Sequence, residues 1–251
     1  MSGLFSGRCV VITGASRGIG LGIARAFAAE GARLHLVADD PAVHARAGEL
    51  GATAAEADIT DPASVERALH GFDLIDALVN NAGLERRTPV SDASPEAFTM
   101  FRRIIDINVV GTALVTRKAL AAMGPGAAIV NTASIWGRVA EARFDAYVAS
   151  KHAIIGLTKT WAKELGPRGI RVNAVCPGWV RTEASMRSLR LMAADQDVPE
   201  EALLEQIVGG QALPGLMEPE DMGEIYLFLA SDRARNITGQ SIAADRGEVP
   251  W

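Results

Sequence analysis

The sequence has little of what marks several other classes of protein. Only two of its 251 residues are cysteine, and only 5% are aromatic. Cys9 and Cys176 lie in apolar runs far apart in the chain, so we expect buried, reduced thiols rather than a disulfide framework. No run rich in lysine and arginine is present, and the formal net charge is −5. This charge pattern argues against nucleic acid as a partner.

Long apolar runs are also missing. No stretch reaches the roughly 18 consecutive apolar residues that a membrane-spanning helix needs. The N-terminus enters an apolar run almost at once, without the charged, apolar and small-residue regions of a signal peptide. The four histidines have no spacing typical of metal ligands. We therefore expect a cytoplasmic protein that has no membrane partner and binds no metal.

What the sequence does have is a regular alternation of short apolar runs and longer helical patterns. Several of the runs are almost continuously apolar, as in parallel strands that are covered on both faces. We predict an α/β fold, a Rossmann-like doubly wound parallel sheet of about seven strands with helices on both faces, as a single domain over residues 1–251. The expected strands are 9–13, 33–38, 52–57, 77–80, 127–133, 171–176 and 240–244, and the expected helices are 18–30, 62–70, 95–122, 147–165 and 219–230.

Residues 180–215 interrupt this alternation. The segment is long, rich in methionine and arginine, and follows an expected strand. Ligands of open α/β sheets bind outside the carboxyl ends of the strands. We therefore predict that 180–215 is an insertion that covers the substrate; a helical insertion on the surface, without such a role, is the alternative.

A glycine-rich turn, "TGASRGIG" over residues 13–20, lies between the first expected strand and the first expected helix. Gly14, Gly18 and Gly20 allow a tight turn and a close approach of the backbone to a pyrophosphate. The helix N-terminus that follows offers free N–H groups and the positive end of its dipole. The position of the turn predicts a dinucleotide site.

The second expected strand ends in "VADD", which places Asp39 close to the offset expected of a ribose-binding acid. A carboxylate there accepts hydrogen bonds from the ribose hydroxyls and repels a 2′-phosphate. Asp40 adds a second negative charge, whereas Arg17 in the glycine turn can reach a 2′-phosphate. Because like charges in a partly desolvated site cost on the order of several kcal/mol, the two acids favour NAD over NADP.

The stretch "DAYVASKHA" holds Tyr147 and Lys151, four residues apart and so on one face of a helix. An exposed phenol has a pKa near 10 and is a poor base at pH 7, but an ammonium within ~4–6 Å lowers that pKa. The pair is therefore either an acid/base device or a solvated polar face, and the spacing alone leaves both open.

Seven motifs together resemble those of the short-chain dehydrogenase/reductase family, in the family's order and over essentially the whole chain. They are "TGASRGIG" at 13–20, Asp58-Ile59, "NNAG" at 80–83, Asn108 in "IDINVVG", Ser134 in "VNTAS", Tyr147 with Lys151, and Pro177-Gly178 followed by Thr182. The sequence departs from the family's usual "DGG" near the C-terminus, where Arg246 follows Asp245; we expect the departure to alter the local turn.

The resemblance implies a role for each matched residue. Tyr147 donates or accepts the substrate proton, Lys151 binds the nicotinamide ribose and lowers the pKa of the tyrosine, Ser134 holds the substrate oxygen, and Asn108 anchors a water that relays protons. The residues implied in cofactor binding are Gly14, Ser16, Arg17, Gly18, Ile19, Gly20, Asp39, Asp58, Ile59, Asn81, Ala82, Gly83, Tyr147, Lys151, Pro177, Gly178, Val180 and Thr182.

The substrate is expected beside Ser134 and Tyr147, between the turn after residue 83, the stretch between those two residues, the residues after Gly178 and the 180–215 insertion. The predicted substrate-binding residues are Ser134, Trp136, Arg143, Phe144, Tyr147 and Trp179. Charged residues in these segments, Arg143 among them, suit a polar substrate, either anionic or a polyol. Arginines on a solvated loop are the alternative interpretation.

The function predicted from these features is the NAD-dependent interconversion of a secondary alcohol and a ketone, on a polar small molecule such as a sugar, polyol or hydroxy acid. The alternatives are an NADPH-dependent ketoreductase and a dinucleotide sensor without enzymatic activity. Family members are often dimers or tetramers, so we expect a homotetramer or homodimer. Trp251 is predicted to be buried against a neighbouring subunit, and the helices 95–122 and 147–165 to form another interface.

Overall fold

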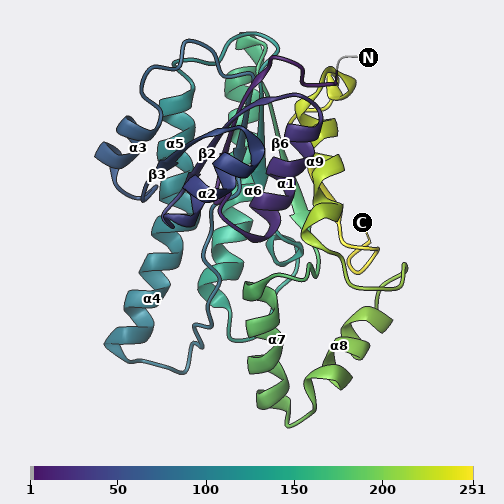
Figure 1. The fold of residues 1–251 in the computed structure, drawn as a ribbon. Helices are drawn as coiled ribbons and strands as arrows, with labels where there is room; N and C mark the ends of the chain where they lie inside the picture. Colours follow the sequence, from purple (N-terminus) through teal and green to yellow (C-terminus); the bar gives the residue numbers. More distant parts are fainter. Residues whose placement is uncertain (1–2, 251) are drawn as a thin grey trace.

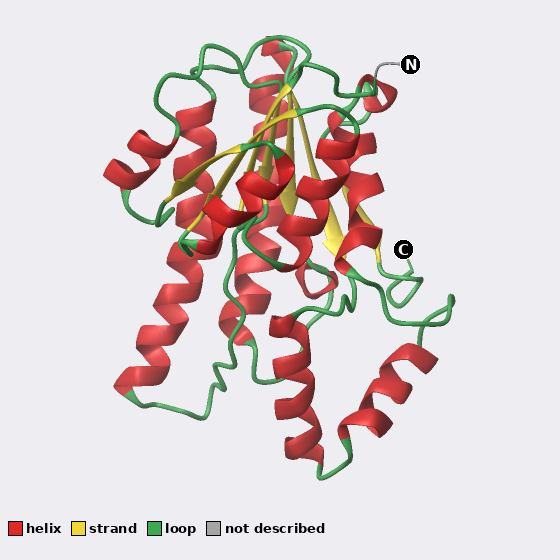
Figure 2. Cartoon of the chain, viewed as in Figure 1, coloured by secondary structure: helices red, strands yellow, loops and turns green. Residues whose placement is uncertain are grey.

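The computed structural model describes residues 3–250, which form a seven-stranded parallel sheet with helices on both faces (Figures 1 and 2). The strand order is β3-β2-β1-β4-β5-β6-β7. The chain therefore builds outward from β1 in one direction and from β4 in the other, and a crevice opens where the direction changes. The strands are β1 (Cys9–Thr13), β2 (Arg33–Ala38), β3 (Thr53–Glu56), β4 (Ala77–Asn80), β5 (Ala128–Thr132), β6 (Arg171–Pro177) and β7 (Ser241–Ala244).

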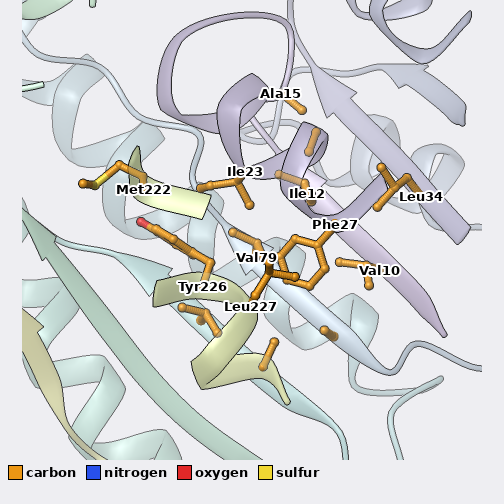
Figure 3. Packing of buried hydrophobic residues seen from close by; sticks show 14 of the residues in the cluster. Val10, Ile12, Ala15, Ile23, Phe27, Leu34, Val79, Met222, Tyr226 and Leu227 are labelled. Carbon is orange, nitrogen blue, oxygen red and sulfur yellow. The ribbon is translucent and has the colours of Figure 1, made fainter. Parts of the chain in front are cut away.

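Alternate residues of β1 pack against opposite layers of helices. Val10 and Ile12 belong to a buried cluster with side chains of α1, α2 and α9, where Phe27, Tyr226 and Leu227 lie close together (Figure 3). Val11 belongs to the cluster on the other face, with side chains of α3, α5 and α6. The helices are α1 (Gly18–Ala29), α2 (Ala42–Leu50), α3 (Pro62–Ala68), α4 (Pro95–Ile105), α5 (Thr112–Ala119), α6 (Asp145–Leu165) and α9 (Gly223–Ala230). The doubly wound fold predicted from the sequence is confirmed.

The strand predictions agree with the structure to within a residue at each end, but two helix predictions need correction. The expected helix 95–122 is three segments, because a π-helical stretch, Asp106–Gly111, separates α4 from α5. Helix α2 was not expected. It is short, and Val43 and Ala47 are its only buried positions, so its apolar pattern is too weak to stand out.

The 180–215 insertion contains two helices, α7 (Glu183–Gln196) and α8 (Glu200–Gly209), which extend beyond the carboxyl ends of the strands (Figure 1). Thr182 caps α7: its hydroxyl accepts a hydrogen bond from the N–H of Ser185, and the Ser185 hydroxyl accepts one from the N–H of Thr182. Leu189 and Leu203, one from each helix, pack with Trp179 in a small buried cluster. The insertion thus has its own apolar contacts with the segment that follows β6.

The C-terminal turn tolerates an arginine where the family's usual motif has glycine. Arg246 has φ 56°, in the left-handed region that favours glycine. Its guanidinium donates to the carbonyl oxygen of Pro214 at 2.7 Å, and its own carbonyl accepts from the N–H of Leu213 at 2.9 Å. These bonds tie the turn to the end of the insertion and offset the strain.

Other predictions made from the sequence meet the structure as follows. Cys9 and Cys176 are both free and buried, as expected. Within residues 3–250, no helix is long and apolar enough to cross a membrane, and no cluster of His, Cys, Asp and Glu is suited to hold a metal ion. Trp251, predicted to lie at a subunit interface, is outside the described residues.

Two helical glycines give a matched test of the packing. A Cβ on Gly22 in α1 would lie 2.3 Å from the carbonyl oxygen of Pro219, whereas a Cβ on Gly48 in α2 would meet nothing within 4 Å. We expect Gly22→Ala to lower the free energy of unfolding by about 1–3 kcal/mol. Gly48→Ala should raise it by about 0.5–1 kcal/mol, because alanine is the better helix former. Urea denaturation of both variants measures the difference, and equal effects would contradict the close contact between α1 and Pro219.

Candidate active site

The glycine-rich turn forms one end of a large cleft, of about 1780 Å³, that runs across the carboxyl ends of the strands. Gly14 and Gly18 have φ values of 67° and 55°, which only glycine adopts readily. A Cβ on Gly20 would lie 2.1 Å from the carbonyl oxygen of Gly14, so the turn closes only without side chains there. No side chain caps the N-terminus of α1, which leaves its first N–H groups available to an anion.

Asp39, at the end of β2, lines the cleft. Asp40 does not add the second negative charge predicted from the sequence, because its carboxylate pairs with Arg17 at 2.5 Å. This salt bridge also engages Arg17, the arginine that was expected to favour a 2′-phosphate. Asp39 is therefore the uncompensated acid at this part of the cleft, among the residues that the structure describes.

Asn81 joins the loop after β4 to the glycine turn. Its side-chain amide donates to the carbonyl oxygens of Thr13 and Gly14, both at 3.1 Å. The Thr13 hydroxyl in turn accepts from the N–H groups of Asn81 and Ala82, both at 3.0 Å. These bonds fix the floor of the cleft where β1 and β4 lie side by side.

Asn108 lies in the π-helical stretch and is buried behind the cleft. Its Oδ1 accepts from the N–H of Leu84 at 2.7 Å, and its Nδ2 donates to the carbonyl oxygen of Leu84 at 3.0 Å and to the hydroxyl of Ser150 at 2.9 Å. Short π-helical segments inside α-helices are frequent at functional sites. Here such a segment lets one carboxamide join the loop after β4 to α6.

Ser134, Tyr147 and Lys151 meet in the cleft, as predicted. Lys151 is 4% exposed; its Nζ donates to the carbonyl oxygen of Thr132 at 2.8 Å and lies 5.4 Å from the centre of the Tyr147 ring. Burial lowers the pKa of Lys151 to about 8. The three groups therefore have the positions that a shared acid/base function requires.

The pKa of Tyr147 differs from the sequence-based expectation. Burial raises it, the negative charge of Glu85 raises it further, and a hydrogen bond with Ser134 lowers it. The pKa of Tyr147 is therefore raised in the chain by itself, because desolvation of the phenol outweighs the other effects. The lowering effect of Lys151 stays a prediction.

All residues predicted to bind the cofactor line this one cleft, from Gly14 to Thr182. The residues present fit a dinucleotide. The uncapped N-terminus of α1 suits a pyrophosphate, and Asp39 suits a ribose. A Cβ on Gly83 would lie 3.3 Å from Asn108 Oδ1 and 3.6 Å from Lys151 Nζ, so glycine avoids a tight contact there. Thr182 lies beside the glycine turn, because a Cβ on Gly18 would lie 3.5 Å from its Cγ2, and Lys151 lines the cleft next to Tyr147.

A smaller recess of about 390 Å³ opens beside Ser134 and Tyr147. Ser134, Trp136, Tyr147 and Trp179 line it, as predicted for the substrate site. Phe144 does not: it is 1% exposed and packs behind Trp136, with ring centres 5.0 Å apart.

Arg143 does not line the recess either, which corrects its predicted role in substrate binding. Its guanidinium pairs at 2.5 Å with Asp195 of α7, and Arg87 pairs with the same carboxylate at 2.6 Å. Asp195 thus forms salt bridges with both arginines. The three residues lie in the loop after β4, the loop before α6 and helix α7. No sequence signal links Asp195 to these loops.

Sequence reasoning missed several residues of the site. The recess is also lined by Glu85, Ser185 and Ser188, and the Ser188 hydroxyl donates to Glu85 Oε1 at 2.5 Å. Thr182 and Ser185 have the spacing of a capping box, and Ser188 is one turn further along. That pattern could have identified α7 and its polar face; nothing in the sequence pairs Ser188 with Glu85.

Comparisons with known sequences identify the family of the chain. A family model described as enoyl-(acyl carrier protein) reductase matches residues 14–248. The chain is 41% identical to the oxidoreductase UcpA of Salmonella typhimurium over 98% of this chain and 96% of that protein. It is 37% identical to galactitol 2-dehydrogenase (L-tagatose-forming) of Cereibacter sphaeroides, over 98% and 96%. It is 34% identical to D-beta-hydroxybutyrate dehydrogenase of Cupriavidus necator, over 98% and 99%.

Solved structures agree with the fold and with a dinucleotide cofactor. A carveol dehydrogenase from Mycobacterium avium in complex with NAD superposes with a TM-score of 0.89 and 29% identity, over 98% of this chain and 99% of that chain. An actinorhodin polyketide ketoreductase with NADPH gives 0.90 and 27%, over 98% of each chain. The chain therefore belongs to the short-chain dehydrogenase/reductase family and is an NAD(P)-dependent oxidoreductase that acts on CH–OH groups.

Proposed function

We propose that the protein is an NAD-dependent dehydrogenase that interconverts a secondary alcohol and a ketone on a polar small molecule. The observation that carries this proposal is the meeting of Ser134, Tyr147 and Lys151 where the recess joins the cofactor cleft. An alcohol oxygen in the recess would lie within reach of both hydroxyl groups, next to the end of the cleft that fits a nicotinamide.

Each catalytic residue has a defined task in this proposal. Ser134 and Tyr147 hold the substrate oxygen between them, and Tyr147 takes its proton or returns it. Lys151 places a positive charge near the phenol and holds a ribose hydroxyl. Asn108 acts by fixing the loop after β4 against α6, and we propose that it also anchors a water. When bound, the dinucleotide accepts or returns a hydride.

The preference for NAD is supported by Asp39. It lines the cleft at the end of β2, and the salt bridge between Arg17 and Asp40 draws the nearest arginine away from a 2′-phosphate. The NADPH-dependent ketoreductase stays the alternative, because the Arg17 side chain is 64% exposed and a surface ion pair is weak. The sensor alternative is set aside, since the family membership identifies an oxidoreductase.

Three further predictions extend this proposal: the covering of the substrate by the insertion, the oligomeric state and the cellular location of the protein. We propose that α7 and α8 cover the bound substrate, since the first turns of α7 line the recess. We also propose a homotetramer or homodimer, for which α4 offers an apolar surface: Phe98 is 62% exposed and stacks on Phe101. A cytoplasmic location stays a prediction from the sequence.

Replacing the phenol tests the acid/base role. Tyr147→Phe should lower kcat by at least about 10²-fold, because proton transfer by a positioned side chain contributes that much or more. The dissociation constant for NAD should stay within about twofold. The matched control is Tyr226→Phe, which alters the only other tyrosine; Tyr226 lines neither the cleft nor the recess, and its hydroxyl bonds to that of Thr132. Retention of more than a few per cent of activity by Tyr147→Phe would exclude the mechanism.

Two neighbouring aspartates test the cofactor preference. We expect Asp39→Ala to lower the ratio of kcat/KM with NAD to kcat/KM with NADP by at least about tenfold, since the carboxylate that remains, Asp40, is paired with Arg17. Asp40→Ala should release Arg17 and improve the use of NADP while leaving the KM for NAD nearly unchanged. If the ratio did not move in Asp39→Ala, Asp39 would not be the ribose-binding acid.

Burial of the Lys151 ammonium should lower the free energy of unfolding by an amount that depends on pH. The pKa of Lys151 is lowered to about 8 by burial, whereas an exposed lysine titrates near 10.4. Between these values the unfolded chain binds more protons than the folded protein, so stability rises with pH in this window. Lys151→Met should therefore raise the free energy of unfolding by on the order of 3 kcal/mol at pH 7, and the gain should shrink toward pH 10.

The control for this experiment is Lys159→Met, an exposed lysine on the same helix. It should change stability little at any pH, and it should keep activity, which Lys151→Met should lose. Denaturation at pH 7, 8.5 and 10 gives the comparison. If Lys151→Met raised the free energy of unfolding by the same amount at every pH, burial of the Lys151 ammonium would not destabilise the folded protein.

A further inference from the structure

The recess beside Tyr147 contains an unusual charge. Among residues 3–250, Glu85 is the one charged side chain that lines it. Ser188 donates to Oε1 at 2.5 Å, and Oε2 has no hydrogen-bond or ion-pair partner among the described residues. Burial raises the pKa of Glu85. An ionised carboxylate only accepts hydrogen bonds, so Oε2 of Glu85 can still accept a hydrogen bond from a donor on a ligand.

The rest of the recess suits a molecule with both C–H faces and hydroxyl groups. Trp136 and Trp179 form an aromatic corner, with ring centres 6.2 Å apart and planes at 85°. Ser134 and Tyr147 lie on the catalytic side, with Glu85 lining the same small space. Apolar walls with a few placed polar groups are typical of sites for small molecules.

No cationic side chain lines this recess; Arg86, Arg187 and Lys151 line the adjoining cofactor cleft. Arg143 and Arg87 are paired with Asp195. Arg138 donates to the carbonyl oxygen of Ser241 and lines neither cavity. A carboxylate on the substrate would instead meet the carboxylate of Glu85.

A cationic substrate is disfavoured for a different reason. Arg86 and Arg187 flank Glu85, and both donate to its carbonyl oxygen, at 2.8 Å and 3.1 Å. Their charges already act on the carboxylate and lower its pKa. An added ammonium would face these arginines and Lys151. The group that satisfies Glu85 without a charge conflict is a hydroxyl.

We propose that this site selects a neutral polyhydroxylated substrate, a polyol or a sugar, whose hydroxyl next to the reacting carbon donates to Glu85. This inference rests on the proposed function and narrows it, because the sequence left polyols, sugars and hydroxy acids equally open. The names of the relatives include both galactitol and hydroxybutyrate dehydrogenases, so the choice comes from the recess itself.

The test compares substrate classes in the wild type and in Glu85→Gln. Galactitol, glucose, 3-hydroxybutyrate and an amino alcohol are assayed with NAD and with NADP. We expect the best neutral polyhydroxylated substrate to exceed 3-hydroxybutyrate in kcat/KM. Glu85→Gln should lower kcat/KM for it by about 10- to 100-fold, mainly through KM, since a charge-assisted hydrogen bond is replaced by a neutral one. Activity on 3-hydroxybutyrate should be unchanged or higher.

Glu141→Gln is the matched control. Glu141 is also half-buried, burial raises its pKa as well, and it lines neither cavity. It should leave the substrate preference unchanged. A second readout avoids catalysis: in the Tyr147→Phe protein with NAD, calorimetry should detect the preferred polyol or sugar, and adding Glu85→Gln should weaken that binding by a similar factor.

The outcomes separate this inference from the proposed function. Oxidation of alcohols with a clear preference for the hydroxy acid or the amino alcohol would overturn the inference alone. So would an unchanged preference in Glu85→Gln. Failure to oxidise any secondary alcohol, with NAD bound, would overturn the proposed function and this inference with it.

Discussion

The site depends on the carboxamide of Asn108. Its three hydrogen bonds join Leu84, in the loop after β4, to Ser150 on α6. Leu84 lies between Gly83 and Glu85 in the chain, and Lys151 directly follows Ser150. A π-turn in the middle of a long helical segment brings this amide to the junction. The relative positions of the loop after β4, Glu85 and Lys151 therefore rest on one buried side chain, whose polar atoms are all bonded.

The distribution of charge is the second constraint on the site. Lys151 is buried with a carbonyl partner and no carboxylate among the described residues, while Tyr147 is desolvated beside Glu85. Neither group has the protonation behaviour that it would have in water. Such arrangements are costly for a folded chain by itself and are typical of functional sites, where a bound charged group completes the electrostatics. The cleft that fits a dinucleotide ends beside these two residues.

The insertion after β6 connects substrate binding to the body of the protein. The start of α7 carries Ser185 and Ser188 into the recess, and its end carries Asp195 to Arg87 and Arg143. The helix is thus attached at both ends to loops that also bear site residues. The segment predicted from the sequence to cover the substrate lines one side of the recess, and its Asp195 pairs with the arginines that suggested an anionic substrate.

The sequence by itself determined the fold class and the strands, and it singled out residues that the fold brings to one cleft, because these depend on local patterns. Apolar runs report burial along a strand, glycines report a turn that a side chain would block, and Tyr147 and Lys151 share a helix face through their spacing. Only the tertiary structure decided the pairing of Arg17 with Asp40, of Arg143 with Asp195 and of Glu85 with Ser188. Long charged and polar side chains reach partners distant in sequence, and no local pattern encodes that choice; desolvation, which sets the pKa of Tyr147, likewise exists only once the chain has packed.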